Sequence, residues 1–305
     1  MQGVVGQLLR MPARVSAVAG VTLTQLMRMR LFAVPAVFAV GFLGLQFVPY
    51  QEHLGVEFQG VQQLQLIKDI ALGCMRLFSM VFCVAATALL IPRDTEDRIL
   101  YTILCKPVPR FDYLAGKALG VLALLGLVLL FMDGLMVGLL QVKAQGIAGE
   151  VQAALSSRGL RAEDIAPYLQ QVYGAANTAD LQRSLVAMYA GFGVLTTFTL
   201  LLSCITSGTI VSMIFALGAY FVGMFQGQLF HSAYGGGSGT TEFMQWVEKV
   251  FAILVPDFSL FSVTDAASSG APLSWALLGG LLLIASAYML LHLLTAAWVF
   301  AIKEF

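Results

Sequence analysis

Charge is scarce in this chain. Only 11% of its 305 residues are Asp, Glu, Lys or Arg, and 59% are hydrophobic. Soluble domains carry about 25% charged residues, so the composition excludes an ordinary soluble globular protein. The charges that are present cancel to a formal net charge of zero. This balance provides no basic footprint of the kind that nucleic-acid-binding proteins carry, and no nucleic-acid partner is expected.

Cysteine and histidine are also few, which argues against disulfide and metal chemistry. The spacing of the four cysteines indicates neither a disulfide pair nor a metal site, and the same holds for metal ligation by the three histidines, His53, His231 and His292. The stretch 236–239 is similar to the G-x-S-G motif of intramembrane serine proteases. No histidine stands in a recognisable motif as its base, however, and a flexible linker is the favoured interpretation.

An ATP-binding loop of the form G-x-x-x-x-G-K-[ST] is absent from the sequence. Gly116-Lys117 is followed by Ala118, and no phosphate-cradling loop precedes it. We therefore predict that this chain hydrolyses no ATP, is not itself an enzyme, and holds no cofactor and no metal.

Long apolar runs are what the sequence has in quantity. About 20 helical residues cross the ~30 Å hydrocarbon layer of a membrane, and the runs do not show the period-2 alternation of a membrane barrel. We predict an all-α membrane protein with one transmembrane domain over residues 1–305. The six predicted spans are about 31–49, 70–92, 114–142, 185–204, 209–229 and 273–302.

The distribution of Lys and Arg predicts the orientation of these spans. With the N-terminus in the cytoplasm, the inner segments carry more Lys and Arg than the outer ones, and the acidic residues follow the opposite trend. Basic residues are retained on the cytoplasmic side of membrane proteins. Both termini and the loop 93–113 are therefore predicted to be cytoplasmic.

Shorter helices are expected beside the spans. Residues 13–30 are typical of an interfacial helix at the inner surface that leads into the first span. The outer excursion 143–184 is predicted to hold two short helices, 150–157 and 162–172, around Gly159.

A second outer excursion, 230–272, is predicted to contain an interfacial or partly re-entrant helix that Pro256 ends. One side of this helix is apolar, and the other carries Glu242, Gln245 and Lys249. The apolar stripe fits packing or an interface, with contact to a substrate as the alternative. It comprises Phe243, Val247, Val250 and Leu254.

The loop 93–113 is the most charged part of the chain. Asp94 or Thr95 is a suitable N-cap, and Glu96 and Asp97 complement the positive end of a helix. One apolar face follows, and Pro107 ends the helix; the face comprises Ile99, Leu100, Ile103 and Leu104. This pattern predicts about three turns of amphipathic helix on the cytoplasmic surface, with a solvated loop anchored at the headgroups as the alternative.

The segment DTEDRILYTILCKPVPRFDYLAGK, which begins at Asp94, resembles the first cytoplasmic loop of type-2 ABC transporter permeases. That loop has an acid-rich start, a core similar to T-I-x-x-L-L-S-K-P-V-x-R, and G-K at the opening of the next span. The surface helix 13–30 and the run IKDIALG (67–73) also resemble the family. The matching loop residues are Glu96, Asp97, Arg98, Tyr101, Thr102, Ile103, Leu104, Lys106, Pro107, Val108, Arg110, Gly116 and Lys117.

This resemblance implies a six-span permease half of a bacterial exporter-like ABC transporter in the inner membrane. The helix 95–105 would be a coupling helix that docks in a groove of a separate ATPase subunit. Two ATPase copies, holding ATP and Mg, and a second permease half, either this chain or a relative, would complete the assembly. The implied ATPase-coupling residues are Asp94, Thr95, Glu96, Asp97, Arg98, Ile99, Leu100, Tyr101, Thr102, Ile103, Leu104, Lys106, Pro107 and Arg110.

A mostly apolar path favours an amphiphilic or lipid-like cargo over a simple ion. A protein of another class remains open: a non-transporting membrane anchor or scaffold that recruits a cytosolic partner. Partner ATPase activity that depends on this chain and responds to cargo would separate the two.

Two charged residues fall inside predicted spans. Arg76 lies in the second span and Asp133 in the third. Charges inside a bilayer are costly and are usually paired or functional. We therefore predict an intramembrane polar pair between Arg76 and Asp133, with a polar lining of the export path as the alternative.

Overall fold

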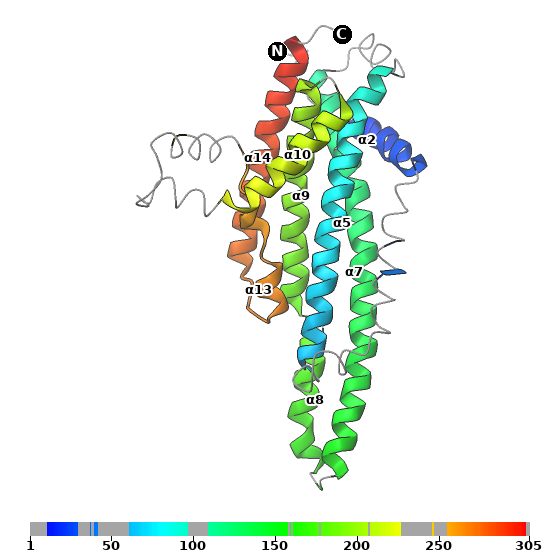
Figure 1. Ribbon diagram of the computed structural model, residues 1–305, viewed down its shortest axis with the longest axis vertical. Coiled ribbons are helices and arrows are strands. Elements are labelled where there is room, and N and C mark those ends of the chain that lie inside the picture. The colour runs from blue at the N-terminus through cyan, green and yellow to red at the C-terminus, as the bar shows by residue number, and fades with distance from the viewer. Residues whose placement is uncertain are drawn as a thin grey trace.

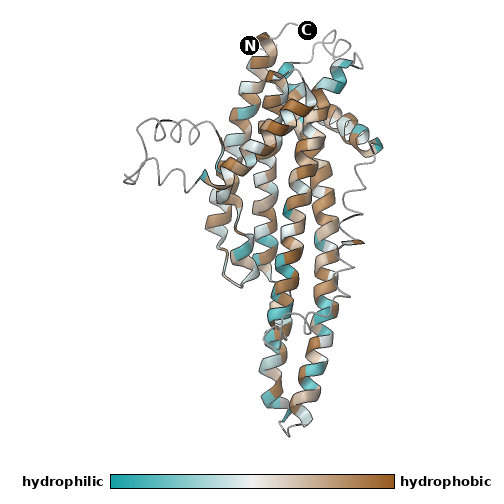
Figure 2. Cartoon of the chain, in the orientation of Figure 1, coloured by the Kyte–Doolittle hydropathy of each residue, from teal (hydrophilic) through white to brown (hydrophobic). Residues whose placement is uncertain are grey.

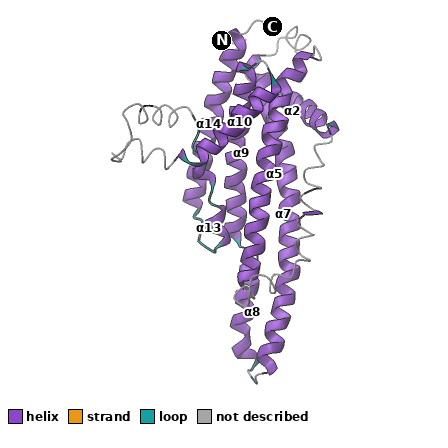
Figure 3. Ribbon diagram, viewed as in Figure 1, coloured by secondary structure: helices purple, strands orange, loops and turns teal. Residues whose placement is uncertain are grey.

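The computed structural model describes most of the chain, and within the described ranges all regular structure is helical, with no strand (Figure 3). Most of the predicted first span, 31–49, and most of the loop 93–113 lie outside the described residues. The described residues are 11–29, 37, 40, 41, 61–96, 109–157, 159, 161–176, 178–206, 208–226, 246 and 255–302.

Among the described residues, four helical stretches are long and apolar enough to cross a membrane. They make the chain an α-helical membrane protein. A fifth apolar helix, α10 (Thr209–Met224), has 16 residues, which give about 24 Å at 1.5 Å per residue. It is therefore shorter than the span predicted at 209–229. The four stretches are α5 (Val61–Glu96), α7 (Arg110–Ser157), the run Glu163–Ile205 and α14 (Trp275–Ile302).

The helix α9 (Ala179–Ile205) forms the middle of the bundle. It buries residues along most of its length and packs against α5, α7, α10 and α14. The helix begins at Thr178, whose side chain accepts a hydrogen bond from the backbone N–H of Leu181, as an N-cap does. By contrast, α14 buries residues on one side and exposes large apolar side chains on the other. Such a helix suits a lipid-facing position at the edge of the bundle.

The α2 helix (Met11–Arg28) confirms a helix over the predicted segment 13–30. It lies across the outside of α7 at one end of the bundle, near the C-terminal end of α5 (Figure 1). The start of α7 and the C-terminal end of α14 lie at this same end. A buried cluster that includes Tyr113 and Phe300 joins them. The face of the bundle that carries the charged loop is thus built from α2, α5, α7 and α14.

At the opposite end, α7 and α8 (Ala162–Ala176) form a helical hairpin that projects from the bundle and is more hydrophilic than the bundle itself (Figures 1 and 2). The prediction of a separate short helix at 150–157 is wrong. One helix runs without a break to Ser157, because apolar residues at helical spacing pack in a core with residues of α8. The turn between them has Gly159 at φ +82°, a backbone conformation that glycine adopts easily.

The described part of the second predicted outer excursion packs into the bundle. The predicted helix before Pro256 lies outside the described residues except for Trp246. After it, a 3₁₀ turn (Ser259–Phe261) and the short helix α13 (Thr264–Ser268) follow. Phe258 and Phe261 are buried, and the segment contacts α5 and α9.

Two glycines permit this close approach. A Cβ atom at Gly191 would lie 2.8 Å from Cβ of Phe261, and one at Gly223 would lie 2.5 Å from the backbone oxygen of Pro256. Polar contacts add to the packing. Lys68 Nζ donates to the Ser268 carbonyl at 2.9 Å. The segment 255–274 is therefore fixed against the bundle at several points.

Replacing Gly223 with alanine is expected to loosen this segment and lower the free energy of unfolding by about 1–3 kcal/mol, the usual cost of overpacking. The measurement is thermal unfolding of the detergent-solubilised protein together with protease cleavage after Phe258 and Phe261. Gly218 is on the same helix, and no atom of the described residues lies within 4 Å of its Cβ position. Gly218→Ala should therefore raise stability slightly. Equal effects of the two substitutions would contradict the packing described.

Candidate functional site

A buried polar cluster lies where the predicted coupling loop leaves and re-enters the bundle. Asp94, in the last turn of α5, is fully buried and accepts a hydrogen bond from the Tyr113 hydroxyl at 2.5 Å. Its carboxylate also forms an ion pair with Lys117 Nζ at 2.6 Å, and both side chains are almost entirely buried. Since Tyr113 and Lys117 belong to the first turns of α7, one carboxylate joins the two helices that flank the loop.

Helix α2 is joined to the same cluster by its side chains. Gln25 accepts a hydrogen bond from Lys117 at 3.3 Å and donates one to Asp94 at 3.5 Å. Near the other end of α2, Arg14 forms an ion pair with buried Asp112 at 2.7 Å. We define Arg14, Gln25, Asp94, Asp112, Tyr113 and Lys117 as the loop-base cluster.

Two glycines on α7 bring α2 this close. A Cβ atom at Gly116 would lie 2.6 Å from Cβ of Val18, and one at Gly120 would lie 2.6 Å from Cβ of Thr22. Residues four apart lie on the same face of a helix, and small residues there let two helices approach to backbone contact. The pair Gly116-Lys117 thus contributes to the contact with α2 in two ways. The glycine allows α2 to approach closely, and the lysine donates a hydrogen bond to Gln25 of α2.

The sequence-based prediction for Asp94 and Thr95 is wrong in its local detail. Neither residue begins a new helix. Both lie within α5, which continues to Glu96 past Pro92, and the Thr95 hydroxyl donates to the Ile91 carbonyl of its own helix at 2.9 Å. The Asp94 side chain serves Lys117 and Tyr113 instead of a helix N-terminus, since it is buried against α7.

The other predicted coupling residues are only partly described. Glu96 is exposed at the end of α5, and Arg110 is half-buried at the start of α7. These two residues flank the predicted coupling segment. The remaining ones lie outside the described residues: Asp97, Arg98, Ile99, Leu100, Tyr101, Thr102, Ile103, Leu104, Lys106 and Pro107.

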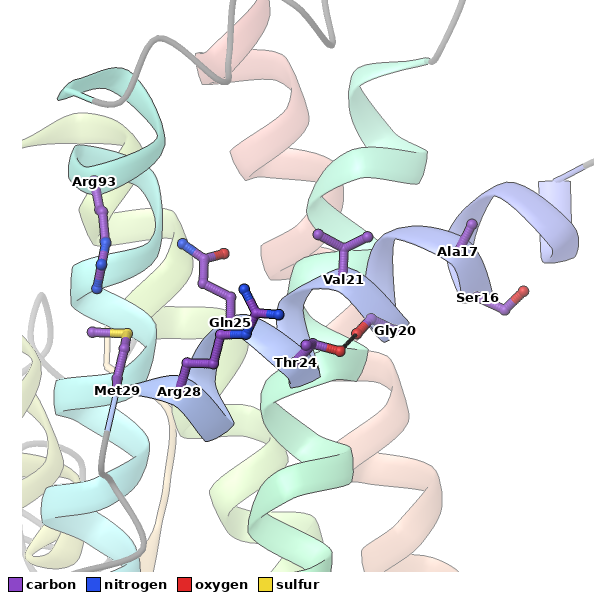
Figure 4. Close-up of a pocket in the computed structure, with 9 residues that line it drawn as sticks. All are labelled: Ser16, Ala17, Gly20, Val21, Thr24, Gln25, Arg28, Met29 and Arg93. Carbon is purple, nitrogen blue, oxygen red and sulfur yellow. Dashed lines mark hydrogen bonds between the residues drawn. The ribbon is translucent and has the colours of Figure 1, made fainter.

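An open groove of about 940 Å³ runs along α2 beside this cluster. In Figure 4, Gln25 and Arg28 lie at the end of α2 that is nearest to Arg93, a residue of α5. The described residues that line the groove include these two arginines and no acid. The groove is therefore lined by two basic side chains and several hydrogen-bonding groups next to the C-terminal end of α5.

The structure gives Arg76 and Asp133 different partners, and no ion pair between the two occurs among the described residues. Arg76 donates a hydrogen bond to the Thr264 hydroxyl and lies 3.5 Å from the Asp265 carboxylate. Asp133 accepts a hydrogen bond from Gln182 of α9 at 3.1 Å. Arg76 thus holds the segment 255–274, whose placement no local sequence pattern indicates.

The charged side chains of the loop-base cluster pair with one another across helices and so fix the relative positions of α2, α5 and α7. The sequence singled out Asp94 as an N-cap, and Gly116 and Lys117 as part of the resemblance, but it did not predict that Asp94 and Lys117 meet. The parts played by Arg14, Gln25, Asp112 and Tyr113 were missed. An acid directly before an aromatic residue and a G-K pair would have been the available signal.

No protein-family model matches the chain, and no curated protein matches it.

Proposed function

We propose that this chain is the membrane subunit of an ABC transporter that uses a separate ATPase subunit to export an amphiphilic or lipid-like substrate. In this proposal both termini and the loop between α5 and α7 face the cytoplasm of a bacterial cell. Two ATPase copies and a second permease half, a copy of this chain or a relative, complete the transporter.

The observation that carries the proposal is the contact of Asp94 with Lys117 and Tyr113. An external ATPase can move membrane helices only through a segment whose two ends are firmly attached to them. The bonds of 2.5 and 2.6 Å from Asp94 join the helix before the loop to the helix after it. A push on the loop would therefore displace α5 and α7 together, and α2 with them.

The resemblance of the loop sequence to type-2 permeases adds to this support. The exposed position of Glu96, at the end of α5, makes its carboxylate available to a partner. Charged residues at the edge of an interface set its register and its association rate. In the proposed docking, the register is set by the charges of Glu96, Asp97, Arg98 and Arg110. The apolar residues between them fill the groove of the ATPase.

Replacing Glu96 and Arg98 together with alanine is expected to reduce the recovery of the ATPase with the affinity-tagged chain in mild detergent by about tenfold or more. This size of effect holds for charged hydrogen bonds that the docked ATPase covers, because truncating such a pair costs about 2 kcal/mol or more and each 1.4 kcal/mol is about tenfold in affinity. Transport should fall in parallel, because coupling requires the docked ATPase.

The matched control replaces Arg161 and Glu163, an exposed pair with the same spacing and charges near the tip of the α7–α8 hairpin. That variant should recover the ATPase as the unchanged protein does. Full ATPase recovery and full transport with the Glu96 and Arg98 variant would contradict the proposed coupling role.

A second candidate function draws on the α7–α8 hairpin. This hairpin projects from the end of the bundle opposite the loop-base cluster (Figure 1), which favours a role in holding an assembly at the outer face. In that case the chain would be a non-transporting anchor. Deletion of the hairpin tip would then release the outer partner, whereas partner ATPase activity would be independent of this chain.

A further inference from the structure

A pocket between α7 and α9 is distinct from the loop-base cluster and from the predicted coupling loop. It has a volume of about 350 Å³ and is lined mainly by apolar side chains, including Leu129, Leu130 and Leu185. Pockets of about 300 Å³ and more are large enough to hold a small ligand or part of a larger one. Leu130 and Val186, at its edge, are 70% and 44% exposed, so the pocket opens outward at the surface that faces lipid in a membrane.

The carboxylate of Asp133 is the charged polar group of this pocket, and it is a hydrogen-bond acceptor. Asp133 accepts a bond from the Gln182 amide nitrogen at 3.1 Å through one carboxylate oxygen. The second carboxylate oxygen has no hydrogen-bond partner among the described residues, and a carboxylate is an acceptor only. The Tyr189 hydroxyl is already committed, since it donates to the Leu122 carbonyl at 3.0 Å. A ligand group that binds to Asp133 would therefore have to supply donors.

The charge of Asp133 has no counter-ion in the part of the pocket that the structure describes. Arg183, the residue after Gln182, forms an ion pair with Asp180 at 2.7 Å and lies over the Trp275 ring at 4.5 Å. Arg76 is engaged by Asp265. A carboxylate in an apolar membrane pocket is costly without a cation. A ligand that brings a positive charge would remove this cost.

We propose that the pocket between α7 and α9 binds the ammonium group of a membrane-soluble amphiphilic amine. Asp133 is the counter-ion of this ammonium group, and the side-chain carbonyl of Gln182 is a second acceptor. An ammonium group has three donors and a full charge. The chain of the amine lies against Leu129, Leu130 and Val186 and continues into the lipid. The inference does not depend on the proposed transport role, because it concerns binding alone.

The test is photolabelling of the purified full chain in lipid nanodiscs with two matched probes. One is a long-chain primary amine with a diazirine on its chain, and the other is the alcohol with the same chain and diazirine. Labelled peptides of α7 and α9 are quantified by mass spectrometry. The unchanged protein should be labelled at the pocket more strongly by the amine than by the alcohol.

Asp133→Asn should reduce pocket labelling by the amine about tenfold, the loss expected when a charged hydrogen bond in an apolar site becomes a neutral one. Labelling by the alcohol should change by less than about twofold. Asp164→Asn, an exposed acid on α8, is the matched control and should leave both probes unaffected.

Equal labelling of the unchanged protein by the two probes would overturn the proposal, as would amine preference that survives Asp133→Asn. If that variant does not purify as a single species, Val186→Trp decides the question. The indole would fill the pocket mouth and leave the carboxylate in place. Loss of pocket labelling by the amine then supports the site, and unchanged labelling overturns it.

Discussion

Replacing Lys117 with methionine is expected to lower the free energy of unfolding by about 3–5 kcal/mol, the cost of leaving a buried charge without its partner. Asp94 is fully buried, and Lys117 is its ion-pair partner at 2.6 Å. Methionine retains most of the side-chain volume, so the loss would report on charge rather than on packing. The measurement is chemical or thermal unfolding in detergent, followed by tryptophan fluorescence and size-exclusion chromatography.

A matched control lies on the same helix. Lys143 is half-buried and has no ion pair among the described residues, so Lys143→Met should change stability by less than about 1 kcal/mol. Removing both charges with Asp94→Asn and Lys117→Met should restore much of the stability lost in Lys117→Met alone, because the uncompensated carboxylate is gone. Equal losses for the lysine single variant and the double variant would contradict the ion pair.

Replacing Gly116 and Gly120 together with alanine is expected to displace α2 from α7. Each new Cβ atom would lie within 2.6 Å of an α2 side-chain atom, and backbone oxygens of Val15 and Ala19 lie 3.0 and 2.9 Å from the two positions. Overpacking of this kind costs about 1–3 kcal/mol at each site. The free energy of unfolding should fall, and the amide protons of α2 should exchange faster with solvent.

Glycine-to-alanine substitutions elsewhere on α7 are expected to raise the free energy of unfolding instead of lowering it. Gly134 and Gly138 have the same spacing, and no atom of the described residues lies within 4 Å of a Cβ at either position. Alanine in place of glycine in a helix adds about 0.5–1 kcal/mol per residue. The variant with alanine at 134 and 138 should therefore be more stable than the unchanged protein. A loss of stability in both double variants would show that the contact with α2 is not the cause.

The broad class of the fold could be predicted from hydrophobicity alone, because about 20 apolar residues in a row have few alternatives to a helix. The ends of the helices could not. The run after 142 contains Gly146 and Gly149 and several polar residues, which locally favour a break. Packing of Ala144, Ile147 and Ala148 in a core shared with α8 overrides this preference.

Contacts between residues that are distant in sequence could not be predicted either. Asp94 has the chemistry of an N-cap, and only the position of Lys117 on the neighbouring helix shows that it is an ion-pair partner instead. Arg76 was predicted to pair with Asp133, but the acid beside it in the structure is another one. That acid is Asp265, from a segment whose return into the bundle depends on the small surfaces of Gly191 and Gly223. No local periodicity encodes such a contact.

The most direct test of the proposed transporter role is to purify the affinity-tagged full chain in mild detergent and to identify what co-purifies. We predict an ATPase subunit in about equal amount to this chain, with ATP hydrolysis that requires the chain and rises with an amphiphilic cargo. Recovery of the chain without any nucleotide-hydrolysing partner, from cells that make it at its natural level, would contradict that role.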